Sequence, residues 1–464
     1  MDMERPARSA IEVEMSRALG LAAAYDPRWS PVKAALAGEA PRDEQLAIAR
    51  MYPMAARRLP MARLRSLAGL AASAWAMLAE RREGRLDFHN PSPLLDEYLE
   101  GNTLPVVPLR PERWPVRNAP LPRHMKDFVT SIAEAVERCL NRAGCCAELS
   151  RRSARITNIH ANEHLTQAYS RIESLRSSFL GRHVGSTLVG GTPKDVGRAL
   201  NWHYARAGRN IWRFSHGGDR AFFSDPVWPM TELPWVTRYY VHGKSEASNL
   251  RGRFSDHEVA RGVEFVSLGS RRHQKWWREG EARRKAHAKS AAGKTRKIIL
   301  FSGAFLGESL MGPLDFRQPD PLALDAQFHA ARILLKQGFE LHVKPHPDGL
   351  KLARSLYAPL GVPIIEGRFD ARAMDADCYV FEFAGSAFFD ALACERGIVL
   401  LDTGARRWDP AGKKDLALRC EIVTAKLDER NRTRADEAEL LEAVNRACDS
   451  RGCPEEFAQG YFFG

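Results

Sequence analysis

Several classes of protein are excluded by what this sequence has little of. Eight cysteines are scattered over 464 residues without a Cys-x-x-Cys pair or histidines at zinc-binding spacing, so we interpret them as reduced, structural thiols. No apolar run approaches the ~20 residues that span a membrane. The best candidate, Leu67 to Ala79, is Ala-rich and interrupted by Ser73, and predicts a buried helix. The N-terminus lacks an apolar core before a cleavage site, which predicts a cytoplasmic protein.

Acidic residues are also in deficit. The chain has 57 Asp and Glu against 69 Lys and Arg, which gives a formal net charge of +12 and a pI near 9.4. This balance favours polyanionic partners such as nucleic acid, nucleotide phosphates or acidic lipid surfaces. The positive charge is spread along the chain without a recognition motif, so we predict no nucleic-acid partner. The basic, Trp-containing segment from Arg271 to Lys297 is interpreted as an interdomain helix and linker.

The order of elements predicts three regions. Residues 1–115 are expected to form a helical N-terminal region, with apolar residues at helical spacing from Pro41 to Arg85, followed by a Pro-rich connector. Residues 116–285 and 290–464 are each expected to form a Rossmann-like domain, because short apolar strands alternate with helices. The fold class is therefore α/β, with parallel, helix-covered sheets.

Strands and helices can be placed within these two domains. In the first, a helix carries Phe128, Ile132, Val136 and Leu140 on one face, and another starts at Thr192-Pro193 and stops near Gly208. The expected strands are 186–189, 210–214, 239–241 and 264–268 in the first domain, and 297–301, 339–343, 363–365, 378–381 and 398–401 in the second. Helices are expected at 324–335 and 386–396 in the second domain.

Three groups of polar residues lie where predicted strands of the second domain end, which is where such folds bind ligands. Ser302-Gly303 follows the first of these strands. Lys344-Pro345-His346-Pro347 follows the next; its prolines fix the backbone around the imidazole, and the lysine suits a phosphate. Gly385-Ser386 starts a helix, where backbone N–H groups and a hydroxyl are donors for an anion.

A fourth group, Ser215-His216-Gly217-Gly218-Asp219, follows a strand of the first domain. The paired glycines allow a tight turn that leaves His216 facing a cleft as a candidate general base. Asp219 could orient this histidine or act as the base itself. No Asp-x-Asp pair suited to a metal follows a strand, because Asp375 and Asp377 precede one, so neither a metal nor a cofactor is predicted.

Taken together, the His-Gly-Gly turn at 216–218, the Lys-x-His-Pro turn at 344–347 and the Gly-Ser helix start at 385–386 resemble bacterial GT-B enzymes of surface-polysaccharide assembly. This group includes capsular Kdo transferases, bacterial sialyltransferase-like enzymes and CDP-glycerol polyol phosphotransferases. The resemblance covers about Val116 to the C-terminus. It implies a GT-B fold, in which two Rossmann-like domains face a cleft.

The resemblance also implies roles for individual residues. His346 would contact the donor phosphate and stabilise or protonate the leaving nucleotide, and Lys344 would add positive charge. Ser386 and the N–H groups around it would hold the same phosphate, while His216 would deprotonate the acceptor hydroxyl. No clear counterpart of the acidic motif of some sialyltransferases is found, so the base stays open between His216 and Asp219. The predicted nucleotide-sugar-binding set is Ser302, Gly303, Lys344, His346, Pro347, Gly385 and Ser386.

These expectations define one function and two alternatives. The expected function is a metal-independent GT-B glycosyltransferase that moves a nonulosonate or Kdo-type sugar from a CMP donor to a surface glycan, a lipid-linked acceptor or a protein such as flagellin. The enzyme would be cytoplasmic and peripheral at the inner membrane face, where its positive charge could meet anionic lipid. One alternative is a CDP-polyol phosphotransferase. The other is a non-enzymatic, polyanion-binding protein.

Overall fold

A computed structural model describes residues 86–102, 106–108, 118–177, 186–190, 195–224, 228–287, 295–302, 320–430, 432–450 and 452–464. The predicted helices within 41–85, the run from Leu67 to Ala79 and the helix start at Thr192-Pro193 lie outside these residues. The described chain falls into two compact units. The second unit comprises Asn90–Leu104, Leu188–Thr192 and Ile211–Gly464, and it contains every described candidate site residue.

The first sheet has six strands in the order β2-β1-β3-β4-β5-β6. The pairs β1–β2, β4–β5 and β5–β6 are parallel, as the alternation of strands and helices predicts. The predicted strands 186–189, 210–214, 239–241 and 264–268 are confirmed within one residue at either end. The six strands are β1 (Leu86–His89), β2 (Val106–Pro108), β3 (Ser186–Val189), β4 (Ile211–Phe214), β5 (Arg238–Val241) and β6 (Glu264–Ser267).

The interpretation of residues 86–115 as helix and connector is wrong for the residues that form β1 and β2, which belong to the first sheet. The proline at the end of β2 does not disrupt this sheet because β2 is an edge strand, where a missing N–H removes no ladder hydrogen bond. In the sequence, helix α5 (Pro93–Gly101) lies between the two strands. Its N-cap residue is Ser92, whose Oγ accepts from the N–H of Leu95 at 3.4 Å. The predicted domain boundaries at 115 and 285–290 stay a prediction.

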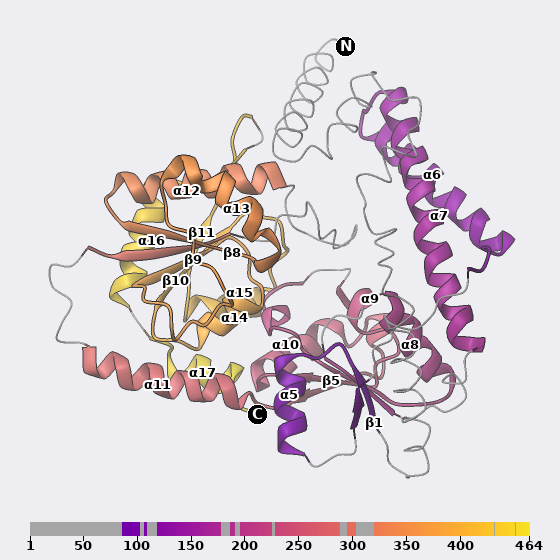
Figure 1. Ribbon diagram of the computed structural model, residues 1–464, viewed down its shortest axis with the longest axis horizontal. Coiled ribbons are helices and arrows are strands. Elements are labelled where there is room, and N and C mark those ends of the chain that lie inside the picture. The colour runs from indigo at the N-terminus through magenta and orange to yellow at the C-terminus, as the bar shows by residue number, and fades with distance from the viewer. Residues whose placement is uncertain are drawn as a thin grey trace. The chain divides into compact units, whose positions relative to one another are not determined.

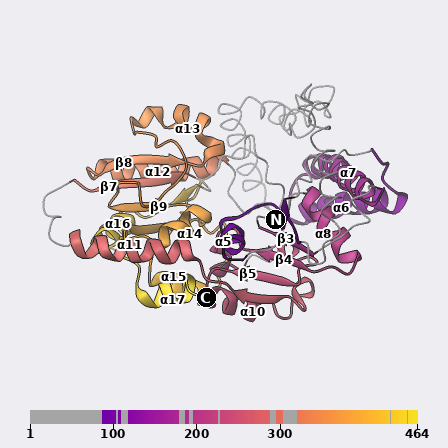
Figure 2. The same cartoon turned by 60° about the horizontal axis from the view of Figure 1, so that its bottom comes forward.

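Two long helices, α6 (Arg123–Arg142) and α7 (Ala147–Ser177), lie side by side as a hairpin (Figures 1 and 2). The predicted helix through Phe128 is confirmed, but its buried side is shifted by one residue. Val129 and Ala133 are buried, whereas Phe128 is 58% exposed. The spacing of apolar residues therefore predicts the helix correctly, but it does not predict which of two adjacent rows of side chains is buried.

Helices follow most strands of the first sheet. Helix α8 ends shortly before Gly208, which has φ +70°, so the predicted stop is confirmed. Helix α11 contains the predicted interdomain helix. The elements are α8 (Asp195–Arg206), η4 (Asp219–Ala221), α9 (Trp228–Glu232), α10 (Lys244–Phe254), η5 (Glu258–Ala260) and α11 (Arg271–His287).

The second sheet has five parallel strands in the order β11-β10-β9-β7-β8. Four predicted strands are confirmed, but 363–365 forms only an isolated bridge from Ile364 to Val343. The short strand β11 was not predicted. The strands are β7 (Lys297–Ser302), β8 (Glu340–Pro345), β9 (Cys378–Phe381), β10 (Gly397–Asp402) and β11 (Glu421–Thr424).

Alternate residues of these strands face two separate cores. Ile299, Tyr379 and Leu400 pack with α14 (Ser386–Leu392), α15 (Pro410–Ala417) and α17 (Glu455–Tyr461). Leu300 and Val380 pack on the other face with α12 (Asp320–Lys336), α13 (Leu350–Tyr357) and α16 (Glu437–Asp449), and Figure 1 shows α12 and α13 on that side. A sheet buried on both faces is the geometry expected of parallel strands joined by helices. The predicted α/β class is confirmed.

Three details complete the fold. Helix α14 ends at Leu392, four residues earlier than predicted for the helix starting at Ser386. The remaining elements are short: η6 (Pro347–Gly349), η7 (Ala358–Leu360), β12 (Lys426–Leu427) and β13 (Thr433–Arg434). Within the described ranges, no helix has the length and apolarity that a membrane crossing requires.

Candidate functional site

The turn after β4 is held by a buried carboxylate. Ser215 donates its backbone N–H to Tyr240 O at 2.8 Å and its hydroxyl to Glu246 Oε1 at 3.2 Å. The same hydroxyl oxygen accepts from Gly218 N–H at 3.2 Å. Glu246 is 0% exposed and also accepts from the backbone N–H of His242 at 2.9 Å. These bonds close the turn around its buried side and leave His216 exposed.

The glycines of this turn allow a close approach to the start of α14. A Cβ on Gly217 would lie 2.8 Å from Ser386 Cα, so only a glycine fits without a shift. Gly218 has φ +69°, and a Cβ there would lie 2.4 Å from the Phe389 ring. The structure thus brings together two groups that lie far apart in the sequence, the His-Gly-Gly turn and Gly385-Ser386. Ser386 itself is exposed and Gly385 is half-buried.

Asp219 is not free in this arrangement. Nη1 of Arg406 donates to Asp219 Oδ2 at 2.9 Å, and both side chains are buried. The same Nη1 donates to Ala384 O at 3.1 Å, directly before Gly385, and the guanidinium carbon lies 3.8 Å from the centre of the Phe223 ring. Arg406 therefore connects the turn after β4 to the residues before α14. The Asp219 carboxylate is therefore committed to this ion pair.

Arg406 was missed by the sequence analysis. It lies in the loop that follows β10, which ends at Asp402, so the rule that ligands bind where parallel strands end applies to it as well. No motif marked it, because a single arginine in a loop is an ordinary surface residue by sequence. The signal that could have found it is its position after the most apolar strand of the second domain.

Three predicted residues lie at the ends of neighbouring strands. Ser302 ends β7 and is buried, His346 follows β8 and is exposed, and Ser386 follows β9. Because β7 lies between β8 and β9, the ends of β8 and β9 are about 10 Å apart, twice the usual strand spacing. His346 N–H donates to Ser302 O at 3.1 Å, which fixes where the histidine leaves the sheet. Exposed Pro347 follows it, and Gly303 lies outside the described residues.

Lys344 differs from the other members of the predicted set. Its side chain is 3% exposed, and its Nζ donates to Pro345 O at 3.1 Å. Burial lowers the pKa of this ammonium group from its usual value. The lysine therefore stays a predicted phosphate contact, but it does not reach the surface beside His346.

A second set of polar residues, also missed in the sequence, contacts α14 through Asp390. His273 Nε2 lies 2.9 Å from Asp390 Oδ1, and Arg272 Nη2 donates to the same oxygen at 2.7 Å. His273 Nδ1 lies 2.7 Å from Ser270 Oγ, which donates to Glu97 Oε1 at 2.9 Å. Asp390 is one helical turn after Ser386, so this chain of contacts fixes the helix that carries Ser386.

The described residues contain no group of three or more His, Cys, Asp or Glu side chains arranged to hold a metal ion. Metal independence stays a prediction.

No family model and no curated protein matches the sequence. Among solved structures, the chain is similar to UDP-GlcNAc 2-epimerase from Methanocaldococcus jannaschii, with a TM-score of 0.45, 10% identity, and coverage of 80% of this chain and 95% of that one. It is also similar to MurG from Acinetobacter baumannii, with a TM-score of 0.32, 11% identity, and 84% and 92% coverage. For the ADP-heptose LPS heptosyltransferase II of E. coli the values are 0.32, 9%, 78% and 98%. At scores this low, the functional argument rests on this chain's own residues.

Proposed function

We propose that this protein is a GT-B glycosyltransferase that binds a nucleotide-sugar donor at the carboxyl ends of β7, β8 and β9. The observation that carries the proposal is the packing of Gly217 against Ser386. The turn that carries the exposed His216 thereby lies against the start of α14, where Ser386 is exposed, and a second exposed histidine, His346, follows β8, two strands from β9. A phosphate-linked donor that spans from His346 to Ser386 would present its sugar to His216.

The residues define a balanced transfer step. His216 accepts the proton of the acceptor hydroxyl, the acceptor oxygen bonds to the anomeric carbon, and the bond from that carbon to the phosphate oxygen breaks. Its electron pair stays with the nucleotide phosphate. Donors placed at that oxygen stabilise it more as the charge develops than before, and His346 and the Ser386 hydroxyl are suited to this role.

A thermal-shift screen with CMP, CDP, UDP and GDP tests donor binding. A ligand at 100 times its Kd stabilises the folded state by about 2.7 kcal/mol, which raises the melting temperature measurably. Ser386→Ala and His346→Ala should each reduce the response. His342→Ala is the matched control, because His342 lies on β8, the strand that His346 follows, but its Nε2 lies 2.9 Å from Glu340 Oε1. No response to any nucleotide would reject both enzyme hypotheses and favour the non-enzymatic, polyanion-binding alternative.

The role of His216 has its own test. His216→Ala should keep the nucleotide response and lose turnover, measured as release of free nucleotide from the donor in the presence of an acceptor. His257→Ala, which changes the histidine that caps η5, is the control. Equal turnover of the His216 variant would reject it as the base. Turnover that persists in EDTA would support the proposed independence from metal.

The finer proposal is a CMP-linked nonulosonate or Kdo-type donor, supported by the resemblance of the three motifs. It predicts a selective response to cytidine nucleotides. A response to UDP or GDP alone would be consistent with a glycosyltransferase but would reject a CMP-linked donor.

The CDP-polyol phosphotransferase alternative differs in its product, because one donor phosphate would remain on the acceptor. In glycosyl transfer, by contrast, the phosphate leaves with the nucleotide. Acceptors at an anionic membrane surface belong to the same proposal, supported by the charge of +12.

A further inference from the structure

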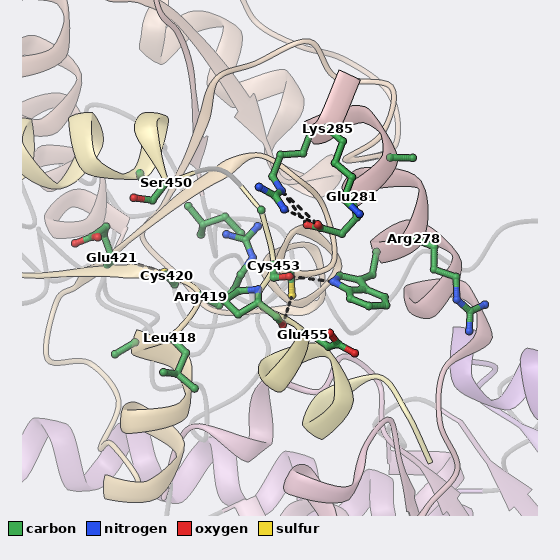
Figure 3. A pocket seen from close by; sticks show the side chains of 18 residues that line it. Arg278, Glu281, Lys285, Leu418, Arg419, Cys420, Glu421, Ser450, Cys453 and Glu455 are labelled. Atoms are coloured by element: carbon green, nitrogen blue, oxygen red, sulfur yellow. Dashed lines mark hydrogen bonds and ion pairs between the residues drawn. The ribbon is translucent and has the colours of Figure 1, made fainter. Parts of the chain in front are cut away.

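A separate cavity of about 840 Å³ lies beside the second sheet, and Figure 3 shows the side chains that line it. It lies between α11, the residues that join α15 to β11, and the described residues Ser450, Gly452, Cys453 and Pro454 between α16 and α17. Ile398, near the start of β10, and Glu421, the first residue of β11, line it. The cavity is therefore at the amino ends of the strands, whereas the candidate donor site is at their carboxyl ends.

One wall of the cavity is apolar and fixed in place. Trp277 lines it, and the indole Nε1 donates to Cys453 O at 3.0 Å, which holds the ring against the segment before α17. Leu418 also lines the cavity and is 46% exposed. A flat apolar group would bury both side chains without rearranging the tryptophan.

The charges around the cavity are unevenly compensated. Arg278 and Lys285 are exposed on α11, and neither forms an ion pair with a carboxylate of the described residues; Arg278 instead lies over the Phe463 ring, 5.7 Å from its centre. By contrast, two of the lining carboxylates are neutralised: Glu281 by Arg284 at 2.8 Å, and Glu421 by Arg446 at 3.0 Å.

The floor of the cavity adds a further positive charge. Arg419 is 6% exposed and donates to several backbone carbonyl oxygens, including Leu392 O at 2.9 Å and Cys394 O at 2.7 Å. These bonds satisfy its N–H groups but do not cancel its charge. Among the described lining residues, Glu455 is the one carboxylate left to oppose three cations, so an anion would be favoured here.

We propose that this cavity binds a small organic anion, with a planar apolar body against Trp277 and Leu418 and its anionic group toward Arg278 and Lys285. Ligands of this class carry an aromatic or alicyclic ring and a carboxylate, sulfonate or phosphate group. Volume and polarity both fit such a ligand, because small-molecule sites are mostly apolar cavities of about 300–1,000 Å³ with a few polar groups that set orientation. This site is distinct from the proposed donor site and does not depend on it.

The test uses two fluorescent probes with the same kind of aromatic body, the anionic 8-anilinonaphthalene-1-sulfonate and the uncharged N-phenyl-1-naphthylamine. We expect saturable binding of the anion to the full chain. In the double variant Arg278→Gln/Lys285→Gln, its Kd should rise at least about five-fold, a loss of ~1 kcal/mol. The Kd of the uncharged probe should change less than about two-fold.

The matched control is Arg271→Gln/Lys275→Gln, which removes the same charge from exposed positions of α11 that do not line the cavity. It should bind both probes as the wild type does. Leu418→Asp should weaken both probes, because it removes the apolar wall. Urea unfolding of each variant checks that it is folded. Unchanged affinity of the anionic probe in the Arg278/Lys285 variant, or an equal loss in the control, would overturn the proposal.

Discussion

Arg406 and Asp219 form a buried ion pair, with 2.9 Å between Nη1 and Oδ2 and side-chain exposures of 6% and 11%. The pair joins the loop after β10 to the turn after β4. The guanidinium of Arg406 also lies against the Phe223 ring and donates to the Ala384 carbonyl oxygen. The relative positions of His216 and Ser386 therefore depend on an ion pair that includes neither residue.

Arg406→Met should lower the free energy of unfolding by about 3 kcal/mol, because it leaves the buried Asp219 carboxylate with the longer contact to Arg220, at 3.7 Å, in place of the Arg406 contact at 2.9 Å. The double variant Arg406→Met/Asp219→Asn should recover part of this loss, since the uncompensated charge is then removed. Urea unfolding followed by tryptophan fluorescence measures both. Arg354→Met, which breaks the exposed pair with Glu366, is the control and should cost less than about 1 kcal/mol. Equal losses in the two single variants would contradict the buried role of Arg406.

Gly217→Ala should destabilise the protein by about 1–3 kcal/mol and weaken the nucleotide response, because its Cβ must push Ser386 Cα away from 2.8 Å. Gly252→Ala is the control. Gly252 lies in α10, has open space around its Cβ position, and should stabilise the protein by about 0.5–1 kcal/mol through helix propensity. The melting temperatures of the two variants should therefore move in opposite directions. A Gly217 variant as stable and as responsive as the wild type would show that the turn and α14 are not packed as described.

The sequence was sufficient for the features that depend on local pattern. Apolar strands that are buried on both faces, such as β9 and β10, were placed within one residue, because short runs of β-branched and aromatic residues between turn residues are typical of buried parallel strands. The edge strand β2 was missed because three residues ending in a proline carry no strand pattern. The groups at strand ends were found because each follows a recognisable strand.

The interactions between distant segments could not be found in the same way. Arg406 meets Asp219 across 187 residues, and His273 meets Asp390 across 117. Each of these residues is common and polar, and its burial depends on how helices and loops pack, which no local pattern encodes. Lys344 illustrates the reverse case: its motif suggested a phosphate contact, but its side chain is 3% exposed, although strand alternation puts it on the same face as the exposed Glu340.

Arg419 and Arg446 provide a comparison of two arginines that both make several hydrogen bonds. Arg419 is buried and binds the carbonyls after α14, whereas the Arg446 side chain is 48% exposed and binds Glu421 and Glu442. Arg419→Met should cost at least about 3 kcal/mol of unfolding free energy, because buried carbonyls lose their donors. Arg446→Met should cost less than about 1 kcal/mol, since exposed pairs are screened. Chemical denaturation at two salt concentrations measures both, and similar costs would contradict the assigned burial.

His273 makes the stability depend on pH. Burial is the main cause that lowers its pKa from 6.5 to about 4, against the opposing effect of the Asp390 carboxylate. The folded protein therefore keeps this imidazole neutral at pH values where the unfolded chain has already bound a proton. Its contribution to stability is complete above about pH 6.5 and is lost as the pH falls towards 4, a change of about 3 kcal/mol at 1.36 kcal/mol per pKa unit.

His273→Gln removes this titration, so its unfolding free energy should fall less between pH 6.5 and 4 than that of the wild type, by about 3 kcal/mol. Comparing the two curves cancels the carboxylates that titrate in both proteins. His124→Gln, a change at an exposed position of α6, should give a curve parallel to the wild type. A His273 variant whose curve is also parallel would mean that the histidine binds its proton equally in the folded and unfolded chain. In that case it would not be buried as a neutral group against Asp390 and Ser270.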